Sequence, residues 1–141
     1  MTPQEVALVQ KSFAEVVPIA DEAAALFYGR LFDTAPELRP LFRGDMRVQG
    51  AKLMAAMKTV VDGLGAVDTI VPTAQALARR HVGYGVKPEH YAIVGAALLW
   101  TLEQGLGAAF TPEVSAAWAA AYGALSHMMI AAAYGAGQSV S

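Results

Sequence analysis

Apolar side chains recur three or four positions apart along most of the chain, the spacing that places them on one face of an α-helix. The first such face consists of Val6, Val9, Phe13, Val16 and Val17. Residues 2–5 supply a threonine cap, a proline at the first helical position and a glutamate three residues after the cap. They predict a capping box, and Pro18 interrupts the helix because proline has no N–H to donate.

Later segments repeat the helical spacing. Their shared faces are Ala24, Phe27, Tyr28, Leu31 and Phe32; Gln49, Leu53, Met57, Val60, Val61 and Leu64; Tyr91, Val94, Leu98 and Leu102; and Val114, Trp118, Ala121, Tyr122, Leu125 and Met129. Between the first two of these faces, residues 34–42 predict a short turn of helix, and the polar residues 43–47 predict a loop.

Glycine and proline mark the remaining boundaries. Gly63 and Gly65 close the helix that carries Gln49, and a further helix is expected from about residue 69 to residue 82. The next helix begins at Pro88, and Thr-Pro-Glu at residues 111–113 begins the last one.

These patterns predict an all-α protein. No segment alternates strictly with period two, and no Asn-Gly or Asp-Gly turn separates two apolar runs. The sequence shows neither an internal repeat nor a low-complexity linker, so the helices are expected to bury their faces against one another in one domain. We expect this domain to span residues 1–135 and residues 136–141 to form a flexible tail.

Composition adds an apolar interior to this picture. Of 141 residues, 55% are hydrophobic and 16% are charged, which leaves room for something apolar inside besides side chains. Up to Glu113, charged residues or glutamine interrupt every apolar stretch before it reaches membrane-spanning length. Residues 116–133 carry no charge, but their apolar side chains are mostly small, and we interpret this stretch as a buried core helix rather than a membrane span.

Charge and cysteine content exclude several classes. The formal net charge is −2 and the largest basic cluster is Arg79-Arg80, which argues against nucleic acid as a partner. The chain has no cysteine, so disulfides, thiolate metal sites and covalent haem attachment are excluded. The N-terminus lacks a basic region followed by an apolar one, and we therefore expect a cytoplasmic protein.

One histidine stands on an apolar helical face. His81 continues the spacing of Ala74, Leu77 and Ala78, shortly before the break at Gly85. A lone imidazole in this position can be the axial ligand of a buried iron, or it can be a core histidine bonded to a backbone carbonyl. From the spacing alone the second interpretation is the more common one.

The order of signals resembles a globin. Gln49 lies seven residues after Phe42 and 32 before His81, and Pro36 lies six before Phe42. Further matching segments are 81–91 (His-Val-Gly-Tyr-Gly-Val-Lys-Pro-Glu-His-Tyr), 106–113, Ala117-Trp118 and Tyr122-Gly123. The resemblance reaches from the first helix to about Tyr134. It is strongest to single-domain bacterial globins and the globin domains of flavohaemoglobins, and more distant to neuroglobins. It implies a globin fold of about six to seven helices around a haem pocket.

On the proximal side, the resemblance makes His81 the iron ligand of a non-covalent haem b. Its second ring nitrogen would donate to the carbonyl of Leu77 or Ala78. Flavohaemoglobins join the proximal histidine and a tyrosine, matched here by Tyr91, to a glutamate on the last helix. Ala133 falls at that glutamate's position, so the relay is incomplete and peroxidase-like chemistry is less expected.

On the distal side, Tyr28 and Gln49 match the residues that hold bound oxygen. Each hydrogen bond would contribute about 1–3 kcal/mol. The alternatives are a core tyrosine bonded to the backbone and a solvated glutamine. Position 49 is not a histidine, so bis-histidine ligation is not expected. The sixth ligand of the ferric iron is left open between water, Tyr28, Gln49 and Lys52.

Apolar positions complete the implied pocket. The resemblance places Phe42, Leu53, Leu77, Val86, Tyr91, Val94, Leu98 and Met129 around the haem, although each apolar one would be ordinary core in any helical protein. Lys52 would reach a haem propionate or remain solvated. His90 and His127 are expected at the surface or in helix packing, and the methionines as core filler.

The resemblance implies reversible binding of oxygen and of other diatomic ligands, with nitric oxide, carbon monoxide and cyanide as candidates. Nitric-oxide dioxygenation is the enzymatic alternative, and it would need an external reductase because no dinucleotide-binding fingerprint is present. A gas sensor and a haem-free helical module are two further classes that the sequence leaves open. We expect neither nucleic acid nor membrane as a partner, and a monomer or weak homodimer.

Overall fold

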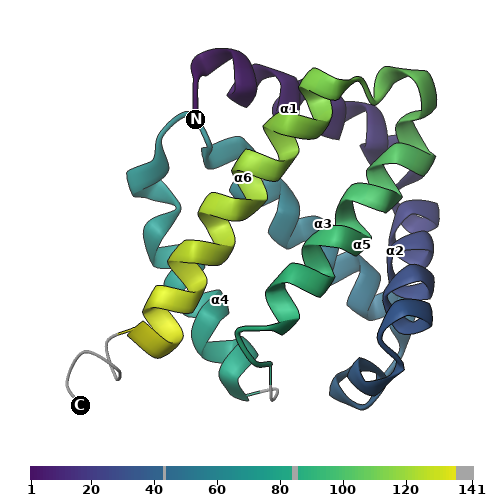
Figure 1. The fold of residues 1–141 in the computed structure, drawn as a ribbon, viewed down its shortest axis with the longest axis vertical. Helices are drawn as coiled ribbons and strands as arrows, with labels where there is room; N and C mark the ends of the chain where they lie inside the picture. The colour runs from purple at the N-terminus through teal and green to yellow at the C-terminus, as the bar shows by residue number, and fades with distance from the viewer. Residues whose placement is uncertain (43, 84–85, 136–141) are drawn as a thin grey trace.

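The computed structural model describes residues 1–42, 44–83 and 86–135 (Figure 1). The α-helices are α1 (Pro3–Val16), α2 (Ala20–Thr34), α3 (Met46–Gly63), α4 (Val71–Gly83), α5 (His90–Leu106) and α6 (Pro112–Ile130). Shorter turns are η1 (Val17–Ile19), η2 (Pro36–Leu41), η3 (Val67–Thr69), η4 (Gly107–Ala109) and η5 (Ala131–Gly135). No strand occurs in these described ranges, which confirms the all-α prediction. The predicted tail at 136–141 and the break at Gly85 lie outside them.

Local sequence sets the ends of α1 as predicted. The Thr2 side chain accepts a hydrogen bond from the Glu5 N–H at 3.1 Å, and the Glu5 carboxylate accepts one from the Thr2 N–H at 2.9 Å. This is the expected capping box. Pro18 lies inside η1, which separates α1 from α2.

Three predicted boundaries shift. Met46 and Arg47, predicted in a loop, begin α3 instead, because the Asp45 carboxylate accepts from the Arg47 N–H at 2.8 Å and caps the helix there. Residues near Thr69 form η3, so α4 begins two residues later than expected, at Val71. Pro88 and Glu89 form a turn, and α5 therefore begins at His90.

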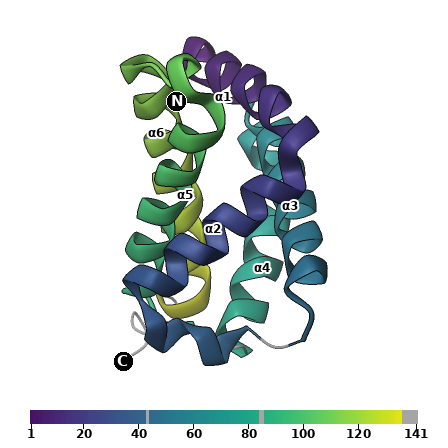
Figure 2. The same cartoon turned by 90° about the vertical axis from the view of Figure 1, so that its right-hand side faces the viewer.

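The helices pack as two crossed layers around one main core. Helix α1 packs on α6, and α2 lies between α5 and α3, as Figure 2 shows. Helix α4 packs on α6 and η5. The indole N–H of Trp118 donates to the Ser12 hydroxyl at 2.8 Å in the buried contact of α1 with α6. These contacts hold α2, α3 and α4 around the region where the candidate site forms.

Two glycines permit close helix crossings. A Cβ on Gly50 would lie 2.9 Å from the Cβ of Ala24, so α3 and α2 meet there. A Cβ on Gly95 would lie 2.6 Å from the ring of Tyr122, where α5 meets α6. Both distances are shorter than carbon atoms tolerate, and a larger residue at either position would separate its helix pair.

The last two helices are apolar along most of their length. The segments His90–Ala109 and Pro112–Ala133 have mean hydropathies of 1.3 and 1.2, and by length and composition alone either could cross a membrane. Core helices have the same composition, and these two contribute Leu98, Leu102 and Trp118 to the buried core. The prediction of a buried helix at 116–133 is wrong in part, because only 22% of the apolar window is buried, along one face.

Candidate functional site

His81 lies in the last turn of α4, half-buried, and its ring is oriented by its own helix. Its Nδ1 lies 2.7 Å from the carbonyl oxygen of Leu77, one turn earlier. Because a carbonyl oxygen only accepts, Nδ1 carries the proton and Nε2 holds the lone pair of the neutral ring. Of the two carbonyls that the sequence analysis offered, the structure selects Leu77. The Val86 N–H donates to the His81 carbonyl at 3.0 Å and ties Val86 to the last turn of α4.

The surroundings of His81 favour its neutral form. Burial lowers the pKa of the imidazole below its usual value, and the neighbouring Arg80 charge lowers it as well. The hydrogen bond to Leu77 acts in the opposite direction. The balance leaves a neutral imidazole near pH 7, which is the form that coordinates a metal ion.

A proximal cluster of apolar residues lies around this helix. Its buried members are Ala74, Ala78, Tyr91 and Met129, and its half-buried members are Leu77, Val86, Leu125, Met128, Ile130, Ala132 and Ala133. The Tyr91 ring stacks beside His81, with centroids 6.4 Å apart and planes at 24°. Ala133, the position matched to a glutamate in flavohaemoglobins, therefore lies in the same cluster as Tyr91.

The backbone of Tyr91 is anchored from α6. The Tyr122 hydroxyl donates to the Tyr91 carbonyl at 2.6 Å, and burial raises the pKa of Tyr122, so the hydroxyl keeps its proton. Gly95 makes this contact possible, because the Tyr122 ring passes where a Cβ would be. Nothing in the sequence pattern indicates this bond.

Tyr28 lies on α2 with 8% of its surface exposed. Its hydroxyl donates to the backbone carbonyl of Gln49 at 3.3 Å, the backbone contact that the sequence left as an alternative. The bond is long for a hydroxyl donor, so it is weak and exchangeable for a better acceptor. Burial raises the pKa of Tyr28 to about 12, and the phenol therefore remains a donor at neutral pH.

Gln49 lies half-buried in the first turn of α3, and its N–H donates to the Asp45 carbonyl at 3.1 Å. The neighbouring Gly50 lets this end of α3 approach Ala24 of α2. The close crossing explains how Gln49 and Tyr28, 21 residues apart, come into contact. Sequence analysis predicted the pair but not the glycine that brings it together.

Three phenylalanine rings pack against Tyr28, and we name these four residues the aromatic cluster. The Phe27 and Phe42 rings meet it edge-on, with centroids at 5.1 and 5.3 Å. The Phe32 ring lies nearly parallel to it, at 6.0 Å and 19°. Phe42 was predicted as a haem contact, whereas the role of Phe32 was missed although its spacing from Tyr28 is one helical turn.

The predicted pocket residues divide between two apolar clusters. Phe42, Leu53, Val94 and Leu98 belong with Tyr28 to the main core, whereas Leu77, Val86, Tyr91 and Met129 belong to the proximal cluster beside His81. Leu125 packs against both. A planar group between Tyr28 and His81 could contact both clusters, and His81 supplies an imidazole donor. The residues present therefore fit a haem.

Other predicted residues lie outside these contacts. Lys52 is exposed on α3, as a propionate partner or a solvated lysine would be. His90 is the first residue of α5, and its Nδ1 accepts a hydrogen bond from the Lys87 N–H at 3.0 Å. His127 is exposed on α6. Within the described residues, no three His, Cys, Asp or Glu side chains are grouped to hold a metal ion.

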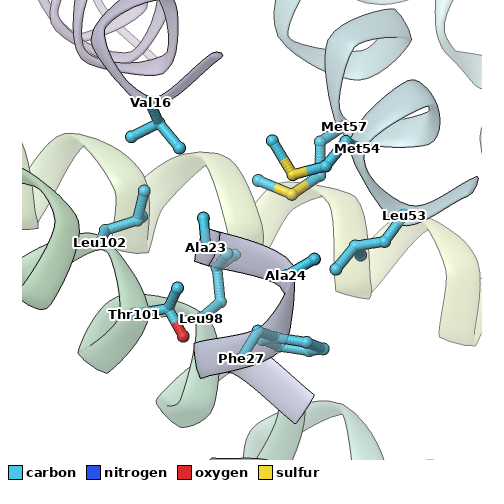
Figure 3. Close-up of a pocket in the computed structure, with 10 residues that line it drawn as sticks. All are labelled: Val16, Ala23, Ala24, Phe27, Leu53, Met54, Met57, Leu98, Thr101 and Leu102. Carbon is cyan, nitrogen blue, oxygen red and sulfur yellow. The ribbon is translucent and has the colours of Figure 1, made fainter. Parts of the chain in front are cut away.

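A small apolar cavity lies among residues of α1, α2, α3 and α5 (Figure 3). Its volume is about 20 Å³, and it is lined by Val16, Ala23, Ala24, Phe27, Leu53, Met54, Met57, Leu98, Thr101 and Leu102. The Thr101 hydroxyl donates to the Ala97 carbonyl at 2.8 Å, so this polar group is already satisfied. Met54 and Met57 act here as core filler, as predicted.

Comparisons with known proteins show the family of this chain. The Globin family model matches residues 25–129. A flavohemoprotein of Bordetella parapertussis is 37% identical over 134 residues, covering 92% of this chain and 33% of its own length. A flavohemoprotein of Bacillus subtilis is 34% identical and covers 74% of this chain and 27% of its own length. The matched part of the chain thus spans 33% and 27% of the length of these two relatives.

A solved structure shows the same fold. A bacterial globin from Campylobacter jejuni superposes with a TM-score of 0.82 at 24% identity, covering 94% of this chain and 96% of that one. The chain belongs to the globin family. Membership implies haem as the cofactor and diatomic ligands such as oxygen, and it confirms the fold that the sequence predicted.

Proposed function

We propose that this protein binds oxygen reversibly at a haem b whose iron His81 ligates, and that nitric oxide, carbon monoxide and cyanide can take oxygen's place. The proposal depends on one observation: four of the expected haem contacts lie with Tyr28 in the main core, and four others lie in the cluster beside His81. When bound, the haem supplies the iron to which the diatomic ligand attaches.

On the proximal side, His81 would present Nε2 to the iron. Its hydrogen bond to Leu77 fixes both the tautomer and the ring orientation before haem arrives. A backbone carbonyl is a weaker acceptor than a carboxylate, and the side chain of Ala133 has no carboxylate. The imidazole would thus donate less electron density than in a glutamate relay, which suits reversible binding better than bond cleavage.

On the distal side, Tyr28 would donate a hydrogen bond to the oxygen ligand. Its present bond to the Gln49 carbonyl is long, so its replacement by a bond to a partly negative oxygen atom is favourable. Gln49 would add a second donor from its side-chain amide. Phe42, Leu53, Val94 and Leu98 would exclude water, and Lys52 would meet a propionate at the pocket mouth.

Reconstitution with haemin, followed by reduction and stopped-flow oxygen binding, tests this proposal. We expect a Soret band and an oxygen complex whose dissociation rate rises about tenfold to a hundredfold in Tyr28→Phe, and by a similar factor in Gln49→Leu. Phe110→Leu, a half-buried phenylalanine away from the site, is the control. Absence of a Soret band would remove the globin function, and unchanged rates would remove the distal roles.

Nitric-oxide dioxygenation is a second candidate, favoured by the similarity to flavohemoproteins. The Tyr28 hydroxyl would hold the oxygen ligand in place, and a reductase would supply the electrons that sustained turnover requires. Stopped-flow mixing of the oxygenated protein with nitric oxide separates the two functions. Oxidation without sustained re-reduction by cellular reductants indicates binding, whereas repeated turnover indicates catalysis.

A further inference from the structure

We propose that Phe32, held by Arg39, is the positioning residue that keeps the Tyr28 hydroxyl aimed at the bound ligand. The inference rests on the proposed function, because it assigns a role toward the ligand donor Tyr28. It concerns neither the iron ligand nor the ligand donor itself, but the packing that determines where the donor points.

The Tyr28 hydroxyl bond cannot fix the ring by itself. The hydroxyl lies 3.3 Å from the Gln49 carbonyl, and a ligand role requires it to leave that acceptor. The orientation of the phenol must then come from the rings packed against it. Those rings are Phe27, Phe32 and Phe42, at centroid distances of 5.1, 6.0 and 5.3 Å.

The three phenylalanines contribute differently. Phe27 is buried in the main core and also lines the small cavity, so it is fixed by neighbours other than Tyr28. Phe42 meets Tyr28 edge-on, at 68°, whereas the half-buried Phe32 lies nearly parallel to it, at 19°. A nearly parallel ring at this distance blocks movement of the Tyr28 ring toward it. Loss of the Phe32 ring would therefore give Tyr28 room to change its orientation.

Arg39 holds the outer part of this arrangement. Its guanidinium carbon lies 5.0 Å from the centroid of the Phe32 ring, a cation–π contact at the surface. The carbonyl of the same residue accepts from the Phe42 N–H at 3.1 Å. Phe32 and Phe42 also touch, with centroids 5.4 Å apart. One exposed residue of η2 is thus linked to two of the rings that enclose Tyr28.

The expected consequence of this positioning is discrimination between oxygen and carbon monoxide. Oxygen gains from an aimed hydrogen-bond donor more than carbon monoxide does, because it takes on more negative charge. Loosening Tyr28 should therefore release oxygen faster and change carbon monoxide release little. A merely structural weakening of the pocket would change both rates together.

The test is a double-mutant cycle on the reconstituted protein. We expect Phe32→Leu to raise the oxygen dissociation rate about two- to tenfold and to split the C–O stretching band of the carbon monoxide complex. In the Tyr28→Phe background, Phe32→Leu should have no further effect, because the donor is already absent. Phe32→Tyr keeps the ring and should restore the rate, and Phe110→Leu should leave it unchanged.

Arg39→Ala gives a second test without removing a core side chain. It should raise the oxygen dissociation rate less than Phe32→Leu does. Arg30→Ala is the control and should have no effect, because the Arg30 guanidinium carbon lies 5.0 Å from the ring centroid of Trp100 instead. If Tyr28→Phe leaves the rate unchanged, the proposed function fails. If Tyr28→Phe raises it while Phe32→Leu acts additively or not at all, only the positioning role is overturned. Should Phe32→Leu not fold, an unchanged rate in Arg39→Ala overturns it equally.

Discussion

The two sides of the candidate haem site are built by different means. On the proximal side, His81 is oriented by a carbonyl one turn earlier in its own helix, among small and aliphatic residues. On the distal side, Tyr28 is held by rings from α2 and from the residue after η2, and its hydroxyl meets α3. The iron ligand thus depends on local backbone, whereas the ligand donor depends on tertiary packing.

This difference separates what each side controls. Changes on the proximal side should act first on haem retention, because a single imidazole attaches the iron to the protein. Changes on the distal side should leave haem bound and alter how long a ligand stays. A variant on one side that changed both haem affinity and ligand dissociation would show that the two sides are not independent.

The largest effect is expected at His81. His81→Ala should weaken haem binding by at least about a hundredfold, because it removes the iron ligand itself rather than a residue that supports one. Haemin titration followed by Soret absorbance measures the affinity. His127→Ala is the matched control, since that histidine is exposed on α6. Equal affinity in His81→Ala and the wild type would place the iron on another residue.

A methyl group at the α2–α3 crossing should disrupt the packing of the distal side. Gly50→Ala places a Cβ 2.9 Å from that of Ala24, and we expect it to lower the free energy of unfolding by about 1–3 kcal/mol. It should also raise the oxygen dissociation rate by moving Gln49 from Tyr28. Gly29→Ala meets nothing within 4 Å and should stabilise the protein by about 0.5–1 kcal/mol. Denaturant unfolding distinguishes the pair, and equal effects would contradict the crossing.

Alkaline pH offers a smaller test of the burial of Tyr28. Its pKa is raised from 10.0 to about 12 in the folded protein. Between these values the unfolded chain loses the proton while the folded one retains it, so stability falls as pH rises. Tyr28→Phe should reduce this slope in urea unfolding followed across that range. A slope identical to that of the wild type would show that the hydroxyl is solvated.

The smallest change is expected from introducing a carboxylate on the proximal side. Ala133→Glu places one in the cluster that holds Tyr91, and it should raise the iron–histidine stretching frequency while leaving oxygen dissociation within about twofold. Ala131→Glu, at an exposed position of the same turn, is the control. If both variants give the wild-type frequency, Ala133 does not face the proximal histidine.

Sequence analysis anticipated the features that local rules determine. The capping box at Thr2 joins residues three positions apart and follows from their spacing, whereas the bond from His81 was expected from the resemblance, with Leu77 or Ala78 as its acceptor. The start of α3 was placed too late because the Asp45 cap was overlooked. The remaining local signals gave the class of fold, and their order gave the family.

Contacts between helices could not be predicted from the sequence in the same way. The approach of Gly50 to Ala24 and the bond from Tyr122 to Tyr91 depend on how distant segments cross. Phe32 was recognised as apolar, but nothing in its spacing shows that Arg39 contacts its ring. The resemblance to a family supplied the site residues, and packing supplies the reasons they are positioned as they are.

Resonance Raman spectroscopy of the reduced, ligand-free holoprotein tests the central claim most directly, because it reports the bond between the iron and a histidine nitrogen. We expect an iron–histidine stretching band in the wild type, its loss in His81→Gly, and its return when imidazole is added to that variant. Persistence of the band in His81→Gly without imidazole would contradict the assignment of His81 and, with it, the division of the site into its two sides.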